Sequence, residues 1–173
     1  VHRDVSPTNV LISLEGVVKL SDFGIAKALV FGEKENKYVA GKQRYMAPEQ
    51  LSSGNVDFRA DIFSTGLLLF ELLTCTAPDR DRPLPRPSQL RPDVPPEVDA
   101  IVARATAERP ADRYATTEEL AVALERAIYE KGYGPTFVTL ARYLAEVFPA
   151  IGVEVASMGE EKTVVLRPGA KGE

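Results

Sequence analysis

The sequence predicts an α+β fold that is mainly helical and has one short β-hairpin near its N-terminus. Residues 61–74 are apolar nearly all round, which is typical of a helix that is buried on every side. Two short β-prone runs, residues 10–12 and residues 17–20, are separated by a Leu14-Glu15-Gly16 turn, which is the pattern of a hairpin. Apolar residues at helical spacing predict amphipathic helices over residues 97–108, 116–128 and 137–148.

The segments between these elements are predicted from their turn and loop residues. Residues 25–46 are mostly polar and aperiodic, which indicates a long functional loop. Pro48 suits the first turn of a short helix. Residues 76–96 hold seven prolines and are predicted to form an extended loop without a helix. Thr116 and Glu119 have the spacing of a capping box at the start of a helix.

The overall composition is that of a globular protein, with 45% hydrophobic and 27% charged residues. The net charge of −4 and the lack of a long basic run argue against nucleic acid and anionic membrane surfaces as partners. No apolar run approaches the ~20 residues of a membrane-spanning helix. Cys75 is the single cysteine, so no internal disulfide can form, and we expect a cytoplasmic location.

Three short motifs occur in order along the chain. The first is His2-Arg3-Asp4, with Asn9 five residues after Asp4, the second is Asp22-Phe23-Gly24, and the third is Ala47-Pro48-Glu49. This order is the signature of a protein-kinase catalytic lobe. The chain therefore resembles the bacterial Ser/Thr protein kinases of the eukaryotic type. The resemblance implies a protein-kinase-like fold, namely a mainly α-helical C-lobe with a short β-hairpin after the catalytic loop.

The resemblance also predicts how the chain is organised. Residues 1–130 would form the kinase C-lobe, from the catalytic loop to the last helix of the lobe. Residues 131–148 would form a C-terminal extension helix. Residues 149–173 would be a linker or the start of a further region. The N-lobe of a kinase carries a Gly-rich loop and a Lys that contact ATP, and we expect this 173-residue chain to lack it, since the catalytic-loop motif begins at His2.

Individual side chains receive roles in the reaction from this resemblance. Asp4 would be the base that accepts the proton of the substrate hydroxyl group. Asn9 and Asp22 would be the ligands of Mg²⁺, since both offer the hard oxygen atoms that this ion requires. Leu11 would lie under the adenine ring of ATP, so ATP and Mg²⁺ are the expected cofactors. Arg3 would pair with a charged activation loop.

Further residues are expected to support this site from the surrounding structure. Glu49 would form a buried ion pair with Arg113. Asp61 would hold the backbone of the catalytic loop from the start of the buried helix. His2 is expected to pack beneath Phe23 rather than to act as an acid or a base. The full supporting set is His2, Phe23, Gly24, Glu49, Asp61 and Arg113.

Two positions depart from the family pattern in a related way. Ser6 stands where Ser/Thr kinases typically have a Lys that reaches the transferred phosphate, and Lys42 stands where they typically have a Thr that contacts that Lys. We therefore expect Lys42 to deliver the positive charge, with Ser6 as its neutral partner; the alternative is a surface Lys42 that contacts substrate. Residues 24–47 contain no Ser or Thr, which excludes activation by Ser/Thr phosphorylation of this loop. Glu33 or Glu35 would offer Arg3 a permanent anion instead.

The function implied by the resemblance is that of a Ser/Thr protein kinase, which transfers the γ-phosphate of ATP to hydroxyl groups of a protein substrate. Without the N-lobe, we expect the isolated chain to be inactive and to expose apolar surface from Ile62 to Leu73. Two alternatives stay open, a pseudokinase-type binding or scaffold module and a truncated gene remnant. Small-molecule phosphotransferases of kinase-like fold share the Asp-to-Asn spacing, but they typically lack the A-P-E motif.

Overall fold

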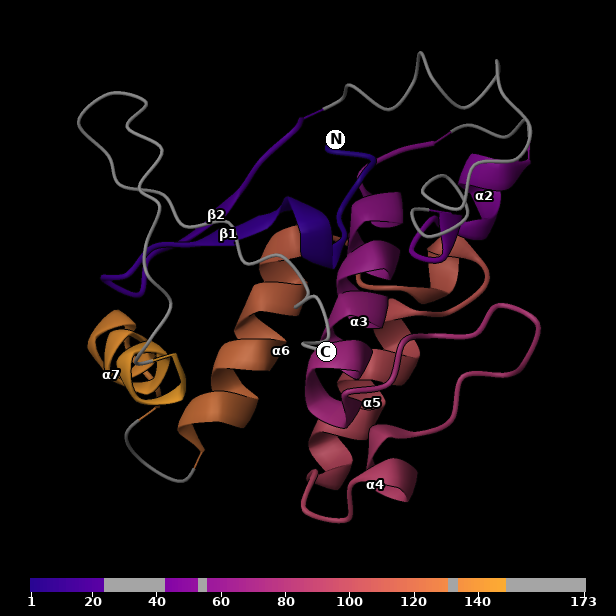
Figure 1. Cartoon of the computed structure of the whole chain (residues 1–173). Coiled ribbons are helices and arrows are strands. Elements are labelled where there is room, and N and C mark those ends of the chain that lie inside the picture. The colour runs from indigo at the N-terminus through magenta and orange to yellow at the C-terminus, as the bar shows by residue number, and fades with distance from the viewer. Residues whose placement is uncertain (24–42, 53–55, 131–133, 149–173) are drawn as a thin grey trace, which may run out of the picture. The chain divides into compact units, whose positions relative to one another are not determined.

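The computed structural model describes residues 1–23, 43–52, 56–130 and 134–148 (Figure 1). The chain divides into two compact units. Unit 1 comprises residues 1–9 and 22–132, and unit 2 comprises residues 10–21 and 133–173. Gly24 and Lys42, which the sequence places at the candidate site, lie outside the described residues.

Unit 1 is helical in its described part. Its elements are the 3-10 turn η1 (Pro7–Asn9), α2 (Pro48–Leu51), α3 (Arg59–Thr74), α4 (Pro87–Leu90), α5 (Pro96–Ala105), the 3-10 turn η3 (Pro110–Asp112) and α6 (Thr117–Tyr129). Helices α3, α5 and α6 pack against one another, and α4 contacts α3 and α5 (Figure 1). With the hairpin of unit 2, these elements confirm the mainly helical α+β fold.

Helix α3 is apolar nearly all round because it contributes residues to two hydrophobic clusters. One cluster joins it to the segment before α2 and consists of Tyr45, Ala47, Ala60, Phe63 and Leu67. The other joins it to α5 and α6 and consists of Ile62, Ile101, Ala105, Tyr114 and Leu120. A Cβ atom built on Gly66 would lie 2.8 Å from a methyl carbon of Ala105 and 2.8 Å from one of Thr106. The lack of a side chain at this position is therefore what allows α3 and α5 to approach so closely.

The prediction that apolar surface is exposed from Ile62 to Leu73 is wrong for most of α3. Ile62, Phe63 and Phe70 are buried, and Ile62 and Phe63 each belong to one of the two hydrophobic clusters. Leu72, by contrast, is 70% exposed.

The prediction of a helix-free loop over residues 76–96 is also wrong, because α4 forms within it. Pro87 occupies the first position of α4, where a helix needs no N–H donor, so this proline starts a helix rather than preventing one. The side chain of Gln89 accepts the backbone N–H of Arg86 at 3.0 Å and caps the turn. The carboxylate of Asp99 in α5 accepts the N–H of Ser88 at 2.9 Å, which ties α4 to α5.

Two helix ends differ in detail from the predicted ones. At the start of α6, Thr116 Oγ1 accepts the N–H of Glu119 at 3.0 Å, as a capping box requires. The reciprocal half of the box is wrong, because the Glu119 carboxylate accepts the N–H of Ala115 instead, at 2.8 Å. Helix α5 ends at Ala105 rather than at Glu108, and the backbone carbonyl groups of Ala107 and Glu108, which follow it, accept hydrogen bonds from Arg113.

Unit 2 holds the hairpin and a helix. Strands β1 (Val10–Ile12) and β2 (Val18–Leu20) are antiparallel, with Val10 paired to Leu20. Gly16 closes the turn with a φ of +81°, and a Cβ there would overlap the carbonyl of Phe137 in α7 (Phe137–Val147). In the described part of the chain, no helix combines the length and the apolar character needed to cross a membrane.

Candidate active site

The backbone of the predicted catalytic loop is held by one carboxylate in the first turn of α3. The N–H of His2 donates to Asp61 Oδ2 at 2.7 Å, and the N–H of Arg3 donates to Asp61 Oδ1 at 2.6 Å. Arg3 has a φ of +69°, in the left-handed region that non-glycine residues rarely adopt. Hydrogen bonds to an ionised group are among the stronger ones in proteins, and these two stabilise the unusual backbone. The contact expected of Asp61 is therefore present.

Asp4 and Asn9 meet because η1 turns the chain back between them. The amide nitrogen of Asn9 donates to the carbonyl oxygen of Asp4 at 2.7 Å and to Asp4 Oδ2 at 2.9 Å. Both residues are buried. Since the amide nitrogen faces Asp4, the other end of the Asn9 side chain presents an oxygen atom, which is the atom that can bind a cation. Ser6 is buried in the same loop, and its hydroxyl group shares a hydrogen bond of 3.0 Å with Thr8.

The D-F-G motif follows directly after β2. Asp22 has a φ of +62°, a conformation that Asp tolerates better than most residues. The ring of Phe23 lies 4.5 Å from the ring of His2, centroid to centroid, so the expected packing of these two residues is present. His2 is buried, and its Nδ1 accepts the N–H of Asp4 at 3.2 Å. Leu11 lies in β1, where it pairs with Lys19.

The residues present fit a magnesium ion bound together with a nucleotide. Among the described residues, no group of three or more His, Cys, Asp or Glu side chains could hold a metal ion alone. Mg²⁺ does not need such a cage, since it is usually bound through one or two protein oxygen ligands together with substrate phosphates and water. The oriented amide of Asn9 and the exposed carboxylate of Asp22 are donors of the required kind.

Glu49 and Arg113 form the ion pair that the resemblance implies. Two bonds of 2.6 and 2.8 Å join the guanidinium group of Arg113 to the two carboxylate oxygens of Glu49. The Arg113 side chain is fully buried, and that of Glu49 is 11% exposed. Three further bonds go to the backbone carbonyl groups of Arg59, Ala107 and Glu108. All N–H donors of this arginine are therefore satisfied.

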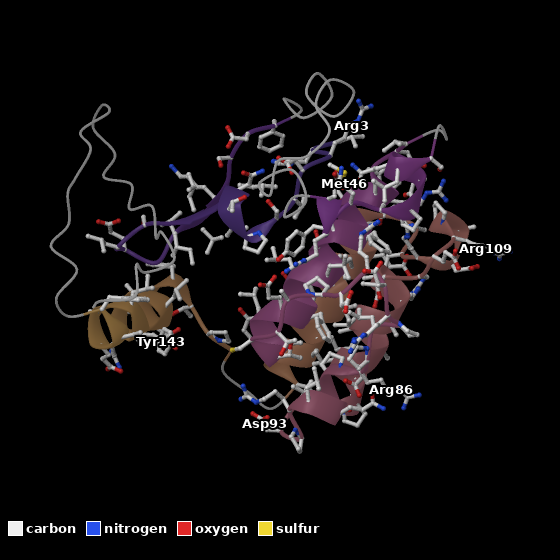
Figure 2. All side chains as sticks on the ribbon, turned by 45° about the vertical axis from the view of Figure 1, so that its right-hand side comes forward. Arg3, Met46, Arg86, Asp93, Arg109 and Tyr143 are labelled. Atoms are coloured by element: carbon white, nitrogen blue, oxygen red, sulfur yellow. The ribbon has the colours of Figure 1, made fainter. Side chains whose placement is uncertain are left out.

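The segment before α2 is anchored to α3 through Tyr45. Its hydroxyl group donates to Glu71, and its carbonyl oxygen accepts a bond of 2.7 Å from the Ser64 hydroxyl. Burial, followed by the contact with Glu71, raises the pKa of Tyr45, so this phenol stays protonated. Figure 2 shows the neighbouring Met46, together with Arg3, near the N-terminal end of α3.

Sequence reasoning missed two contacts in this region. The apolar pattern of the helix over residues 61–74 gives no sign of the bond between Tyr45 and Glu71, and no motif predicts the bond of 2.9 Å from the Gln50 side chain to the carbonyl oxygen of Arg3. The position of Gln50, two residues after Pro48, does predict that its side chain caps the first turn of the helix. Among the described residues, Nε of Arg3 is buried without a hydrogen-bond partner.

Comparison with known proteins places this geometry in a family. The protein kinase domain matches residues 1–118. Among curated relatives, the tyrosine-protein kinase MasK of Myxococcus xanthus is 43% identical over 159 residues, which cover 83% of this chain and 24% of the relative. The serine/threonine-protein kinase PknL of Mycobacterium tuberculosis is 41% identical over 150 residues, which cover 79% of this chain and 37% of the relative.

A solved structure shows the same relationship in three dimensions. The kinase domain of Mycobacterium tuberculosis PknI aligns with a TM-score of 0.56 and 33% sequence identity, over 73% of this chain and 45% of that domain. The chain thus spans less than half of the proteins and of the domain that it matches. Its motifs, the Asp61 and Arg113 contacts and these matches agree, and the chain belongs to the protein kinase family, with bacterial kinases of the eukaryotic type as its relatives.

Proposed function

We propose that this chain is the C-lobe of a Ser/Thr protein kinase, which transfers the γ-phosphate of ATP to a hydroxyl group of a protein substrate. The observation that carries the proposal is the pairing of Asp4 with Asn9 on a loop whose backbone Asp61 holds. In the proposed reaction Asp4 is the base and Asn9 a metal ligand, and phosphoryl transfer uses such a pair side by side. The relatives include both a serine/threonine and a tyrosine kinase by name, so the acceptor residue is part of the proposal.

Within the proposed reaction, Asp4 accepts the proton of the substrate hydroxyl group. The hydroxyl oxygen then bonds to the γ-phosphorus, while the bond from this phosphorus to the bridging oxygen of ATP breaks and ADP leaves. The hydrogen bond from Asn9 keeps the Asp4 carboxylate in one rotamer. Asn9 and Asp22 would hold Mg²⁺, which neutralises charge on the phosphate groups when it is bound.

We propose further that Lys42 supplies the positive charge that related kinases take from a Lys at the position of Ser6. Ser6 is buried two residues from Asp4 in the catalytic loop, and its small hydroxyl group bonds to Thr8. Because Ser6 is neutral, another residue of the chain has to provide the positive charge near the transferred phosphate. Transition-state charge stabilisation is usually a large part of catalysis, so the cation would matter strongly for turnover.

The isolated chain is proposed to transfer little phosphate. It spans 45% of the solved PknI kinase domain, and a kinase binds ATP between two lobes. The second candidate function is a pseudokinase-type binding module, and the observation that favours it is Ser6 at the position where Ser/Thr kinases typically have a Lys.

The test is phosphate transfer by the protein expressed at full length from its gene. We expect Mg²⁺-dependent transfer of labelled γ-phosphate from ATP to Ser or Thr of a general protein substrate, and we expect Asp22→Ala to abolish it. Phosphoamino-acid analysis of the product identifies the acceptor. Transfer that Asp22→Ala leaves unchanged, or full activity of the 173-residue chain alone, would contradict the proposal.

A further inference from the structure

The side chain of Gln50 in α2 makes a contact at each end of its amide. Its Oε1 accepts the backbone N–H of Ala47 at 2.9 Å, and its Nε2 donates to the carbonyl oxygen of Arg3 at 2.9 Å. Because one partner is a donor and the other an acceptor, only one orientation of the amide satisfies both. Gln50 therefore joins the start of α2 to the catalytic loop.

The Arg3 carbonyl belongs to the peptide unit that leads into Asp4. The N–H of the same peptide unit donates to His2 Nδ1 at 3.2 Å. Both polar groups of this unit are thus held, the carbonyl by Gln50 and the N–H by His2. Since Arg3 has a φ of +69°, release of its carbonyl would let the backbone relax and would move the Cα atom of Asp4.

Helix α2, which carries Gln50, is itself held in place by other contacts. The residue next to Gln50 is Glu49, whose ion pair with the fully buried Arg113 fixes α2 to the helical body of unit 1. The segment that enters α2 is fixed as well, by the bond from Ser64 to the Tyr45 carbonyl. Because α2 is fixed in this way, the Gln50 side chain can restrain the loop that contains Arg3.

Helix α4 repeats the local sequence and structure of α2 and provides an internal comparison. Both are single turns that begin with Pro and have Gln at the third position and Leu at the fourth. Gln89 caps α4 as Gln50 caps α2, through a bond of 3.0 Å from the N–H of Arg86 to Gln89 Oε1. Capping thus accounts for one end of each glutamine. It does not account for the bond from Gln50 Nε2 to the catalytic loop.

We propose that Gln50 is a positioning residue of the kinase reaction. It orients Asp4 by holding the carbonyl group of Arg3, and it couples the segment that ends in α2 to the catalytic loop. The effect on turnover rests on the proposed kinase function, whereas the effect on the loop does not.

Gln50→Glu separates the two roles of the side chain. The variant keeps an oxygen acceptor for the Ala47 N–H, and a negative charge in the first turn of a helix is favourable, so the cap is retained. It loses the donor to Arg3. Gln50→Leu loses both bonds, and Gln89→Glu is the matched control because it changes the same position of an equivalent turn.

The hydrogen-exchange rate of the Asp4 backbone amide in the 173-residue chain measures how often this loop opens, and the measurement does not require kinase activity. We expect exchange about tenfold faster in Gln50→Glu than in the wild type, since one hydrogen bond that holds this peptide unit is gone, and no change in Gln89→Glu. An Asp4 amide that exchanges in Gln50→Glu as in the wild type would overturn the inference.

Kinetics of the protein expressed at full length from its gene give the second measurement. A positioning role predicts that kcat falls about tenfold in Gln50→Glu while KM for ATP is unchanged, and that Gln89→Glu behaves as the wild type. Equal kcat values for the two Glu variants would overturn the coupling to catalysis. If the wild-type protein transfers no phosphate, the proposed function fails, and the exchange rate of Asp4 still decides whether Gln50 holds the loop.

Discussion

Replacement of Glu49 by alanine should destabilise the protein strongly, because it leaves a buried cation without its anion. The Arg113 side chain has no exposed surface, and the Glu49 carboxylate accepts two of its hydrogen bonds, at 2.6 and 2.8 Å. Removal of one partner of a buried pair typically costs 3–5 kcal/mol. Arg113 keeps its three bonds to backbone carbonyl groups in the variant, so we expect the lower end of this range, about 3 kcal/mol.

Urea unfolding followed by circular dichroism measures this free energy in the 173-residue chain. For a chain of this size, about 3 kcal/mol also lowers the thermal midpoint by roughly 6–12 °C. Asp112→Ala is the matched control, because it breaks an exposed pair whose two bonds to Arg109 are both 2.8 Å. Exposed pairs contribute little, so the control should unfold close to the wild type.

A second variant tests the cause of the loss. Glu49→Leu combined with Arg113→Met removes both charges, and it should be more stable than Glu49→Leu alone, because no unpaired charge is left in the interior. The reasoning would be refuted if Glu49→Ala cost less than about 1 kcal/mol or unfolded like Asp112→Ala.

Two further predictions concern helix packing and catalysis. Gly66→Leu should lower the free energy of unfolding by about 1–3 kcal/mol, because its side chain would collide with Ala105 and Thr106. Leu72→Ala on the exposed side of the same helix should change it by less than about 0.5 kcal/mol, and equal losses would contradict the close packing. Lys42→Met in the full-length protein should slow turnover by ~10²-fold, and an unchanged rate would show that Lys42 does not act on the phosphate.

The large elements of the fold could be predicted because their patterns are local. The apolar residues of α3 and the spacing within α5, α6 and α7 are visible in a single stretch of sequence. Helix α4 could not be predicted by counting prolines, since the same residue that breaks a helix interior is favoured at its first position. The apolar pattern correctly predicted that Ile62 and Phe70 are buried, whereas the expected exposure of this helix in the isolated chain was wrong because the neighbouring elements of unit 1 cover it.

The candidate site shows a similar division. The roles of Asp61, Glu49 and Arg113 were expected from the resemblance to protein kinases, and the contacts expected of them are present. The bond from Gln50 to Arg3 could not be predicted, since the two residues lie 47 positions apart and such a contact leaves no periodic pattern in the sequence. The role of Lys42 stays a prediction, because this residue lies outside the described residues.

The most direct test of the central claim, that Asp4 acts as the base in phosphate transfer, is kcat of Asp4→Asn in the full-length protein at saturating Mg²⁺ and ATP. Asn can keep the fold of the loop but cannot accept the proton, so kcat should fall by ~10²-fold or more while KM for ATP is unchanged. Asp93→Asn, which changes an exposed aspartate paired with Arg91, should behave as the wild type. Wild-type turnover by Asp4→Asn would contradict the account.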